Sequence, residues 1–176
     1  MVNPDGPERT EVLSWADVDK LLDVLLPQLR TGGPYDAMVM ITRGGVIPGG
    51  MLAEALDIRH LLTAAVDFPS TEAAGMMAWP SFLQFPDSDL LVGRRTLVVD
   101  DVWGSGRKST AVHGHVQAAG GSTLTCVLHY NPYRSRFGKT GPDFYGAVTD
   151  AYVVYPWEMD RGVRGIALNS PEPDVN

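Results

Sequence analysis

The chain has 176 residues, of which 44% are hydrophobic and 20% are charged, which suits one globular domain with a buried core. The net charge of −7 argues against a general basic surface for nucleic acid or anionic membranes, so any phosphate site must be local. The sequence has no apolar stretch long enough to span a bilayer, and its single cysteine, Cys126, fits a reducing cytosol. We therefore expect a cytoplasmic protein that binds neither nucleic acid nor membranes.

Helical and strand patterns alternate along the first part of the chain. Residues 1–13 are polar and are expected to form a flexible arm, after which Ser14 can cap a helix that reaches about residue 30. Pro27 is expected to bend or shorten the last turn of this helix. The next predicted elements are a wholly apolar strand over 37–41, a helix over 46–56 and a strand over 61–66.

The turn between the first predicted strand and its helix reads Thr42-Arg43-Gly44-Gly45. Glycines let backbone N–H groups approach an anion closely, and an adjacent guanidinium adds a positive charge. The turn can therefore form an anion site. The alternative is a plain connection whose glycines relieve backbone strain.

The connection over residues 67–93 contains prolines and several aromatic side chains but no Lys or Arg. A connection of this length is usually a functional loop, so we predict that it acts as a lid. Trp79 and Phe82 are candidates to close the lid by apolar contact, and they are equally candidates for an interface.

Residues 96–109 carry the strongest functional signal. A predicted strand over 96–99 ends in Asp100-Asp101, and the turn Gly104-Ser105-Gly106 leads into a helix predicted over 108–119. Ligands of open α/β sheets bind at the carboxyl ends of strands, where carboxylates can accept hydrogen bonds from sugar hydroxyls or hold hydrated Mg²⁺. The glycine turn and the helix start suit a phosphate. The alternative is a solvated strand end.

The last part of the chain continues the alternation of elements. It comprises a predicted strand over 123–129, a polar connection over 130–146, a short strand over 151–155 and a tail over 161–176. We therefore predict one α/β domain over residues 14–160, in three layers, with a mostly parallel central sheet and helices on both faces. The two glycine turns then open on the same edge of the sheet and can share one ligand. His113 and His115 lie two residues apart on a predicted helix, a spacing that does not favour a shared metal ion.

The residues from Val98 to Gly106 resemble the PRPP motif of type I phosphoribosyltransferases, in which two acids precede a phosphate loop. Thr42-Arg43-Gly44-Gly45 resembles the pyrophosphate loop of that family. The similarity to the bacterial xanthine–guanine branch extends over roughly residues 12–160. The further matching segments are Ser14-Trp15, residues 43–49, Ile58-Arg59-His60 and Tyr155-Pro156-Trp157-Glu158.

The resemblance implies the type I phosphoribosyltransferase fold with a small hood, and an enzyme that transfers the phosphoribosyl group of PRPP to a nucleobase, most simply a purine. It implies Mg²⁺ as the cofactor and a homodimer or homotetramer as the assembly. The catalytic set would be Arg43, Asp100 and Asp101, in which the two acids hold the ribose hydroxyls directly or through the metal. The PRPP site would consist of Arg43, Gly44, Asp100, Asp101, Gly104, Ser105, Gly106, Arg107, Lys108 and Ser109.

The resemblance also implies a base site near the end of the chain. Tyr152 stands where purine-specific relatives place a stacking aromatic residue, and the backbone of Val153 would read the edge of the base. Asn131 takes the position of a lysine that contacts the purine 6-oxygen. Glu158 is assigned to the same site, with a surface charge as the alternative.

The chain departs from the 6-oxopurine enzymes at four points, of which Asn131 in place of the lysine is one and Lys108 in place of the usual Thr of the phosphate loop is another. Many of those enzymes carry a third acid where this chain has Gly104, and their closing loop carries a basic residue, whereas residues 67–93 have none. A non-catalytic protein that binds PRPP or a nucleotide and regulates a protein partner is therefore a second hypothesis. Transfer to an acceptor other than a nucleobase is a third.

Overall fold

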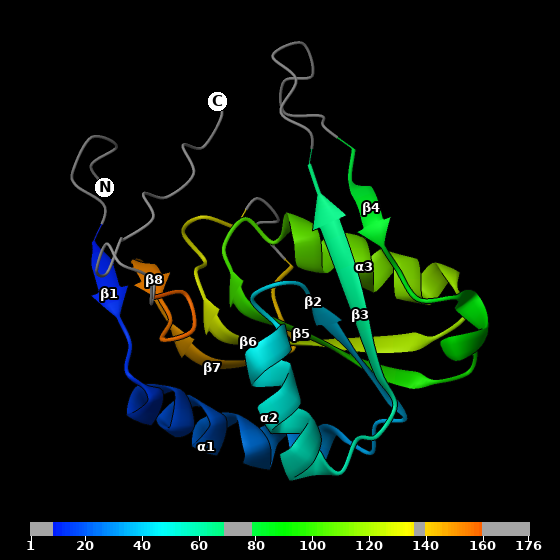
Figure 1. The fold of residues 1–176 in the computed structure, drawn as a ribbon, viewed down its shortest axis with the longest axis horizontal. Helices are drawn as coiled ribbons and strands as arrows, with labels where there is room; N and C mark the ends of the chain where they lie inside the picture. Colours follow the sequence, from blue (N-terminus) through cyan, green and yellow to red (C-terminus); the bar gives the residue numbers. More distant parts are fainter. Residues whose placement is uncertain (1–8, 69–78, 136–139, 160–176) are drawn as a thin grey trace.

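The computed structural model describes residues 9–68, 79–135 and 140–159. Its centre is a six-stranded sheet in the order β4-β3-β2-β5-β6-β7 (Figure 1). All neighbouring strands of this sheet are parallel except β4, which runs antiparallel to β3. The strands are β2 (Ala37–Ile41), β3 (Leu61–Asp67), β4 (Ser81–Gln84), β5 (Arg95–Trp103), β6 (Ser122–Tyr130) and β7 (Phe144–Val148).

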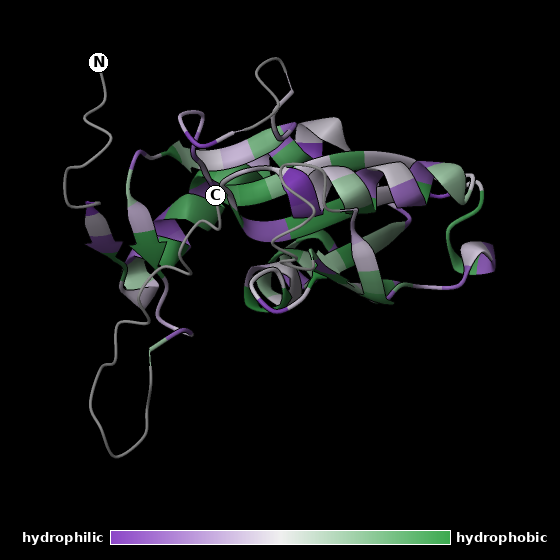
Figure 2. Cartoon of the chain, turned by 90° about the horizontal axis from the view of Figure 1, so that it is seen from above, coloured by the Kyte–Doolittle hydropathy of each residue, from purple (hydrophilic) through white to green (hydrophobic). Residues whose placement is uncertain are grey.

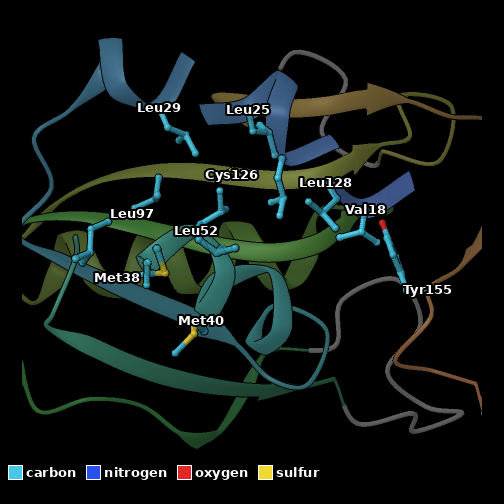
Figure 3. Packing of buried hydrophobic residues seen from close by; sticks show 14 of the residues in the cluster. Val18, Leu25, Leu29, Met38, Met40, Leu52, Leu97, Cys126, Leu128 and Tyr155 are labelled. Atoms are coloured by element: carbon cyan, nitrogen blue, oxygen red, sulfur yellow. The ribbon is translucent and has the colours of Figure 1, made fainter. Parts of the chain in front are cut away.

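Helices cover both faces of the sheet, and side chains along each strand alternate between the two. On one face α1 (Trp15–Gly32) and α2 (Val46–Leu56) pack on a core that includes Leu97 and Leu128 (Figure 3). On the other face α3 (Arg107–Ala118) packs on a core that includes Val98. The central strands are accordingly largely hydrophobic in Figure 2. The predicted three-layer α/β fold is confirmed.

The first helix is longer than predicted. A capping box between Ser14 and Asp17 fixes its start, since the Ser14 Oγ accepts the Asp17 N–H (3.3 Å) and the Asp17 carboxylate accepts the Ser14 N–H (3.1 Å). The helix then continues through Pro27 to Gly32. Pro27 lies on the exposed side, where water can bind the carbonyl that loses its helix partner, while Leu25 and Leu29 on either side are fully buried.

The N-terminal arm and the last strand also differ from the prediction. Thr10–Val12 form β1, which pairs in parallel with β8 (Tyr152–Val154) in a separate two-stranded sheet. Part of the expected flexible arm is therefore a strand, and the last strand stands apart from the central sheet. β1 was not predicted, because its three residues are too few for a periodic pattern to reveal it, whereas β8 lies within the strand predicted over 151–155.

Part of the predicted lid, residues 81–84, forms the edge strand β4 of the central sheet in this structure. β4 is followed by a short 3₁₀ helix, η2 (Ser88–Leu90), and the rings of Phe82 and Phe85 contact His115 on α3 at centroid distances of 4.0 and 4.7 Å. Trp79 is exposed. Residues 69–78 lie outside the described residues, and the lid function stays a prediction.

The connections reverse direction between β2 and β5. The chain leaves β2 through α2 on one face to reach β3, and it leaves β5 through α3 on the other face to reach β6 (Figure 1). Where two neighbouring parallel strands send their connections to opposite sides, a crevice opens at their carboxyl ends, and ligands of such sheets bind there. The turns after β2 and β5 are the two glycine turns singled out above.

The packing of α1 can be tested with two adjacent positions. Leu25→Ala removes a side chain that is fully buried against the sheet, and we expect it to lower the free energy of unfolding by about 2–5 kcal/mol. Val24→Ala, on the half-exposed side of the same helix, should change it by less than about 0.5 kcal/mol. Urea unfolding of both variants measures the difference. Equal effects would contradict the described orientation of α1.

Candidate active site

The acidic pair lies within β5, which runs on to Trp103 instead of ending before the acids. Because side chains alternate along a strand, Asp100 continues the row of Val98 on the α3 face, and Asp101 continues the row of Val99 on the α2 face. The two carboxyl groups therefore lie on either side of the sheet edge, each toward a different glycine turn.

Both carboxylates are buried, with exposures of 7% for Asp100 and 8% for Asp101. Burial raises the pKa of Asp100 well above its usual range, and the charge of Asp101 raises it further. Burial also raises the pKa of Asp101, to about 6, with the charge of Glu158 as the second cause. The pair receives some compensation from backbone donors, since the Asp101 N–H donates to Asp100 (3.0 Å) and the Val102 N–H donates to Asp101 (2.7 Å). The site thus holds negative charge that a cation or a ligand rich in donors would stabilise.

The turn after β2 lies directly against Asp101. A side chain at Gly44 would overlap the Asp101 carboxyl group, and one at Gly45 would overlap the carbonyl oxygen of Val99. Only glycine permits this approach of the backbone to the acid. Arg43 is exposed, its peptide bond with Thr42 is cis, and its carbonyl accepts the N–H of Val46 at the start of α2 (3.1 Å). The structure therefore brings the Arg-Gly-Gly turn and the acidic pair together.

On the α3 side of the pair, a pocket of about 240 Å³ opens at the start of the helix. The first turn of α3 places the positive end of the helix dipole at the pocket, and it carries Arg107 and Lys108. The charge of Lys108 lowers the pKa of Asp100, although the larger effect of burial raises it. The pocket is lined by Asp67, Phe68, Asp100, Val102, Gly104, Ser105, Gly106, Arg107, Lys108 and Ser109.

The indole of Trp103 packs against Gly106 in the turn at 104–106. Gly106 adopts a φ of 77°, and a side chain there would overlap the indole ring. The indole Nε1 donates to the Ser135 hydroxyl at 3.4 Å, and the ring is only 2% exposed. The positive φ and the contact with the indole therefore both require glycine at position 106.

Tyr155 links the acidic pair to the end of the chain. Its hydroxyl donates to the Asp101 carbonyl oxygen (2.9 Å) and lies 2.8 Å from His129 Nδ1, and all three groups are buried. The ring stacks on Trp157 with a centroid distance of 4.7 Å and an interplanar angle of 6°. The Glu158 carboxylate accepts the Tyr155 N–H (2.8 Å), which closes a turn at 155–158. Glu158 thus belongs to this turn, and its negative charge raises the pKa of Asp101.

The other residues assigned to the base site lie at the same end of the sheet. Asn131 is buried after β6, and its side-chain oxygen accepts the N–H groups of Tyr133 (3.1 Å) and Arg134 (3.2 Å). The Tyr152 N–H donates to the carbonyl of Arg9 (2.7 Å), so Tyr152 faces β1 through its backbone. Backbone groups alternate along a strand, so the N–H and C=O of Val153 point away from β1, and within the described residues β8 pairs with no other strand.

Four residues of this region were not predicted from the sequence. Asp67 and Phe68 line the pocket, Trp103 supports the phosphate loop, and Tyr155 holds the Asp101 backbone. The position of Asp67 and Phe68 at the end of β3 could have been found from the sequence, because a parallel strand next to β2 must end at the same edge. The roles of Trp103 and Tyr155 depend on contacts that only the folded chain reveals.

A sheet with this switch point, an acidic pair at the end of its central strand and a glycine turn on each side of the pair has the architecture of type I phosphoribosyltransferases. No protein-family model matches the chain. Over 159 residues, however, it is 30% identical to the xanthine-guanine phosphoribosyltransferase of Ruegeria sp., and the alignment covers 84% of each chain. It is 29% identical over 156 residues to the protein of the same name from Roseobacter denitrificans, again with 84% coverage of each chain.

A solved structure supports the same assignment. The purine phosphoribosyltransferase from Pyrococcus horikoshii Ot3 matches with a TM-score of 0.72 and 26% identity, over 88% of this chain and 97% of that one. The chain belongs to the type I phosphoribosyltransferase family of enzymes. No helix in the described ranges has both the length and the apolar character needed to cross a membrane.

The raised pKa of Asp101 predicts a pH-dependent cost in stability. A carboxyl whose pKa is higher in the folded than in the unfolded state destabilises the fold above that pKa, and the cost disappears as pH falls toward the unfolded value. In protein freed of metal with a chelator, Asp101→Asn should therefore raise stability by about 1–3 kcal/mol near neutral and alkaline pH, since a shift of one unit corresponds to about 1.4 kcal/mol.

Thermal unfolding of wild type and variant as a function of pH measures this effect. The advantage of the variant should shrink as pH falls through about 6. Asp19→Asn on the exposed side of α1 is the matched control and should show no such pH-dependent gain. A gain that is constant with pH would contradict the assigned origin.

Proposed function

We propose that the protein transfers the phosphoribosyl group of PRPP to a 6-oxopurine base, guanine, xanthine or hypoxanthine, in a Mg²⁺-dependent reaction that releases pyrophosphate. The observation that carries the proposal is the buried acidic pair between two glycine turns at the β2–β5 switch point. PRPP has the complementary pattern, with a 5′-phosphate and a pyrophosphate at opposite ends of a ribose that carries vicinal hydroxyls. The names of the relatives support a purine as the acceptor.

Each end of PRPP has a matching set of donors. The 5′-phosphate would bind at residues 104–109, where the helix start, the Ser105 hydroxyl and the cations of the first turn converge. The pyrophosphate would bind the backbone of Gly44 and the side chain of Arg43. The ribose hydroxyls would donate to the carboxylates of Asp100 and Asp101, which lie between the two turns.

The acidic pair also fits a divalent cation. Two buried carboxylates with raised pKa values gain from a nearby positive charge. Mg²⁺ is usually held by one or two carboxylates together with water and substrate oxygens, and across the described residues no cluster of three or more His, Cys, Asp or Glu side chains offers a full set of ligands. Asp100 and Asp101 would thus hold the ion together with PRPP. When bound, the ion supplies positive charge that stabilises the leaving pyrophosphate.

The chain's own groups act on a substrate that is held at both ends. The reaction breaks the bond between C1 of the ribose and the pyrophosphate oxygen and forms a bond from C1 to a ring nitrogen of the base. The ring N–H proton that the base loses passes to water or to the released pyrophosphate. Positive charge develops on the ribose, where the carboxylates of Asp100 and Asp101 stabilise it, and negative charge develops on the pyrophosphate, where Arg43 and the turn N–H groups stabilise it. Because folded backbone fixes these groups, they need little reorganisation in the transition state.

The base site uses the open backbone edge of β8. Among the described residues no strand pairs with the outer edge of β8, so the N–H and C=O of Val153, which face away from β1, would pair with the edge of a purine, and Tyr152 would stack on its face. The Asn131 oxygen already serves the turn at 131–134, so its amide N–H₂ group is the part that would donate to the purine 6-oxygen. Glu158 contributes through the turn that fixes Tyr155.

One observation favours a second candidate function. Gly104 offers no carboxylate at the position where many 6-oxopurine enzymes carry a proton acceptor, so the same site would also suit a regulatory protein that binds PRPP or a nucleotide without turnover. The two functions differ in a single measurable step, the release of pyrophosphate.

A base panel separates these functions. The full chain is incubated with Mg²⁺, PRPP and guanine, xanthine, hypoxanthine, adenine, uracil or orotate in turn, and pyrophosphate release is followed. We expect release with at least one 6-oxopurine, and loss of PRPP binding in the double variant Asp100→Asn, Asp101→Asn. Asp19→Asn should behave as wild type. Tight PRPP binding without turnover would support the regulator, and unchanged PRPP affinity in the double variant would refute the site.

The missing acid can be supplied by mutation. A Cβ atom at Gly104 would meet no atom within 4 Å, so position 104 has room for a side chain to begin without displacing its neighbours. A positioned general base contributes about 10²–10⁴-fold to proton transfer. We expect Gly104→Asp to raise kcat with its preferred purine by about tenfold or more relative to Gly104→Asn, which has the same shape but cannot accept a proton. Equal kcat values for the two variants would show that this position takes no part in proton transfer.

A further inference from the structure

One contact on the pocket wall is not used in the proposed phosphoribosyl transfer. The guanidinium carbon of Arg107 lies over the ring of Phe68, 4.0 Å from its centroid. Both residues line the pocket, and Arg107 is the first residue of α3. The contact joins the phosphate loop to the end of β3, two segments that are 39 positions apart in sequence.

The ring of Phe68 is held in place independently of Arg107. It packs against the α3-face core, and its N–H donates to the carboxylate of Asp67 (2.8 Å). On the other side of the contact, the Arg107 N–H donates to the Ser105 hydroxyl (3.4 Å), which ties the backbone of the arginine to the loop. The ring is therefore a fixed surface on which a long, flexible side chain rests.

Such a contact suits an arginine that binds phosphate. An aromatic ring attracts a guanidinium through its face, and this attraction uses none of the in-plane N–H donors that bind phosphate oxygens. An arginine that is already oriented also loses less side-chain entropy when the anion binds. Residues 67–93 contain no Lys or Arg and so bring no positive charge of their own to the pocket. Through the ring of Phe68, this segment instead contacts the positive charge of Arg107.

We propose that Phe68 is a positioning residue for phosphoribosyl transfer, whose ring holds the Arg107 guanidinium at the pocket wall where it binds a phosphate of PRPP. The inference rests on the proposed function, because it requires PRPP as the ligand of this pocket. It assigns to Phe68 a contribution to substrate affinity that depends on Arg107 and on the aromatic face.

The test compares variants at position 68 in two backgrounds, with PRPP and Mg²⁺ as the probe and the full chain as the protein. Phe68→Leu should weaken PRPP binding about three- to tenfold, the range of a partly desolvated cation–π contact, and should raise KM for PRPP while kcat changes less than about twofold. Phe68→Tyr keeps the aromatic face and should stay within about twofold of wild type. In an Arg107→Met background, Phe68→Leu should have no further effect.

A matched control separates positioning from general packing. Phe85→Leu is the same exchange in the same hydrophobic cluster, but the Phe85 ring contacts Phe82 on β4 and His115 in the last turn of α3. We expect it to leave PRPP affinity unchanged. Thermal unfolding of each variant shows whether it is folded, and Phe68→Tyr keeps the proposal testable if Phe68→Leu is not.

The outcomes distinguish failure of the proposed function from failure of the positioning role of Phe68. If the wild-type chain fails to bind PRPP, the proposed function fails and this inference fails with it. If wild type binds PRPP and Phe68→Leu binds equally well, or loses the same factor with and without Arg107, the proposed function stands and the positioning role of Phe68 is refuted.

Discussion

The reversal of the chain connections between β2 and β5 is the constraint on which the site depends. Because α2 and α3 leave these neighbouring strands on opposite faces, the carboxyl ends of the strands are left uncovered. The backbone of Gly44 then reaches the Asp101 carboxyl group, and the start of α3 comes to lie beside Asp100. A glycine turn on each side of an acidic pair follows from this topology together with the alternation of side chains along β5.

The crevice gathers positive groups around its two acids, although the chain as a whole is negatively charged. A protein with a net charge of −7 buries two adjacent acids at this edge and places near them Arg43, Arg107, Lys108 and the positive end of the α3 dipole. Burial raises the pKa of both carboxyl groups and so makes them costly to ionise, and the charge of Asp101 adds to that cost at Asp100. Such unfavourable charge is retained where a ligand or cation relieves it, which ties the instability of the site to its binding capacity.

Secondary structure could be predicted from the sequence where consecutive residues share the same environment. Runs such as residues 37–41 are buried on both faces, so every position is apolar and the strand is evident. The glycine turns were equally evident, because only glycine permits the close approach at Gly44 and the positive φ at Gly106. β4 and β7 were missed because they are edge strands with half-exposed side chains, and β1 was missed because it is stabilised only by pairing with β8 across the fold. β8 itself lies within the strand predicted over 151–155.

The contacts that could not be predicted are those that join the two turns to the rest of the site. Tyr155, which directly follows β8, donates a hydrogen bond to the carbonyl of Asp101, and its own N–H is bound by Glu158. One buried residue therefore connects β8, where the base site is proposed, to the acidic pair. Phe68 supports Arg107 from the opposite side of the crevice. Motif residues face the ligand and can be recognised by their chemistry, whereas supporting residues face the motif and need only fill a shape. A hydroxyl at position 155 and a ring at position 68 carry no local signal, although the geometry of the site depends on both.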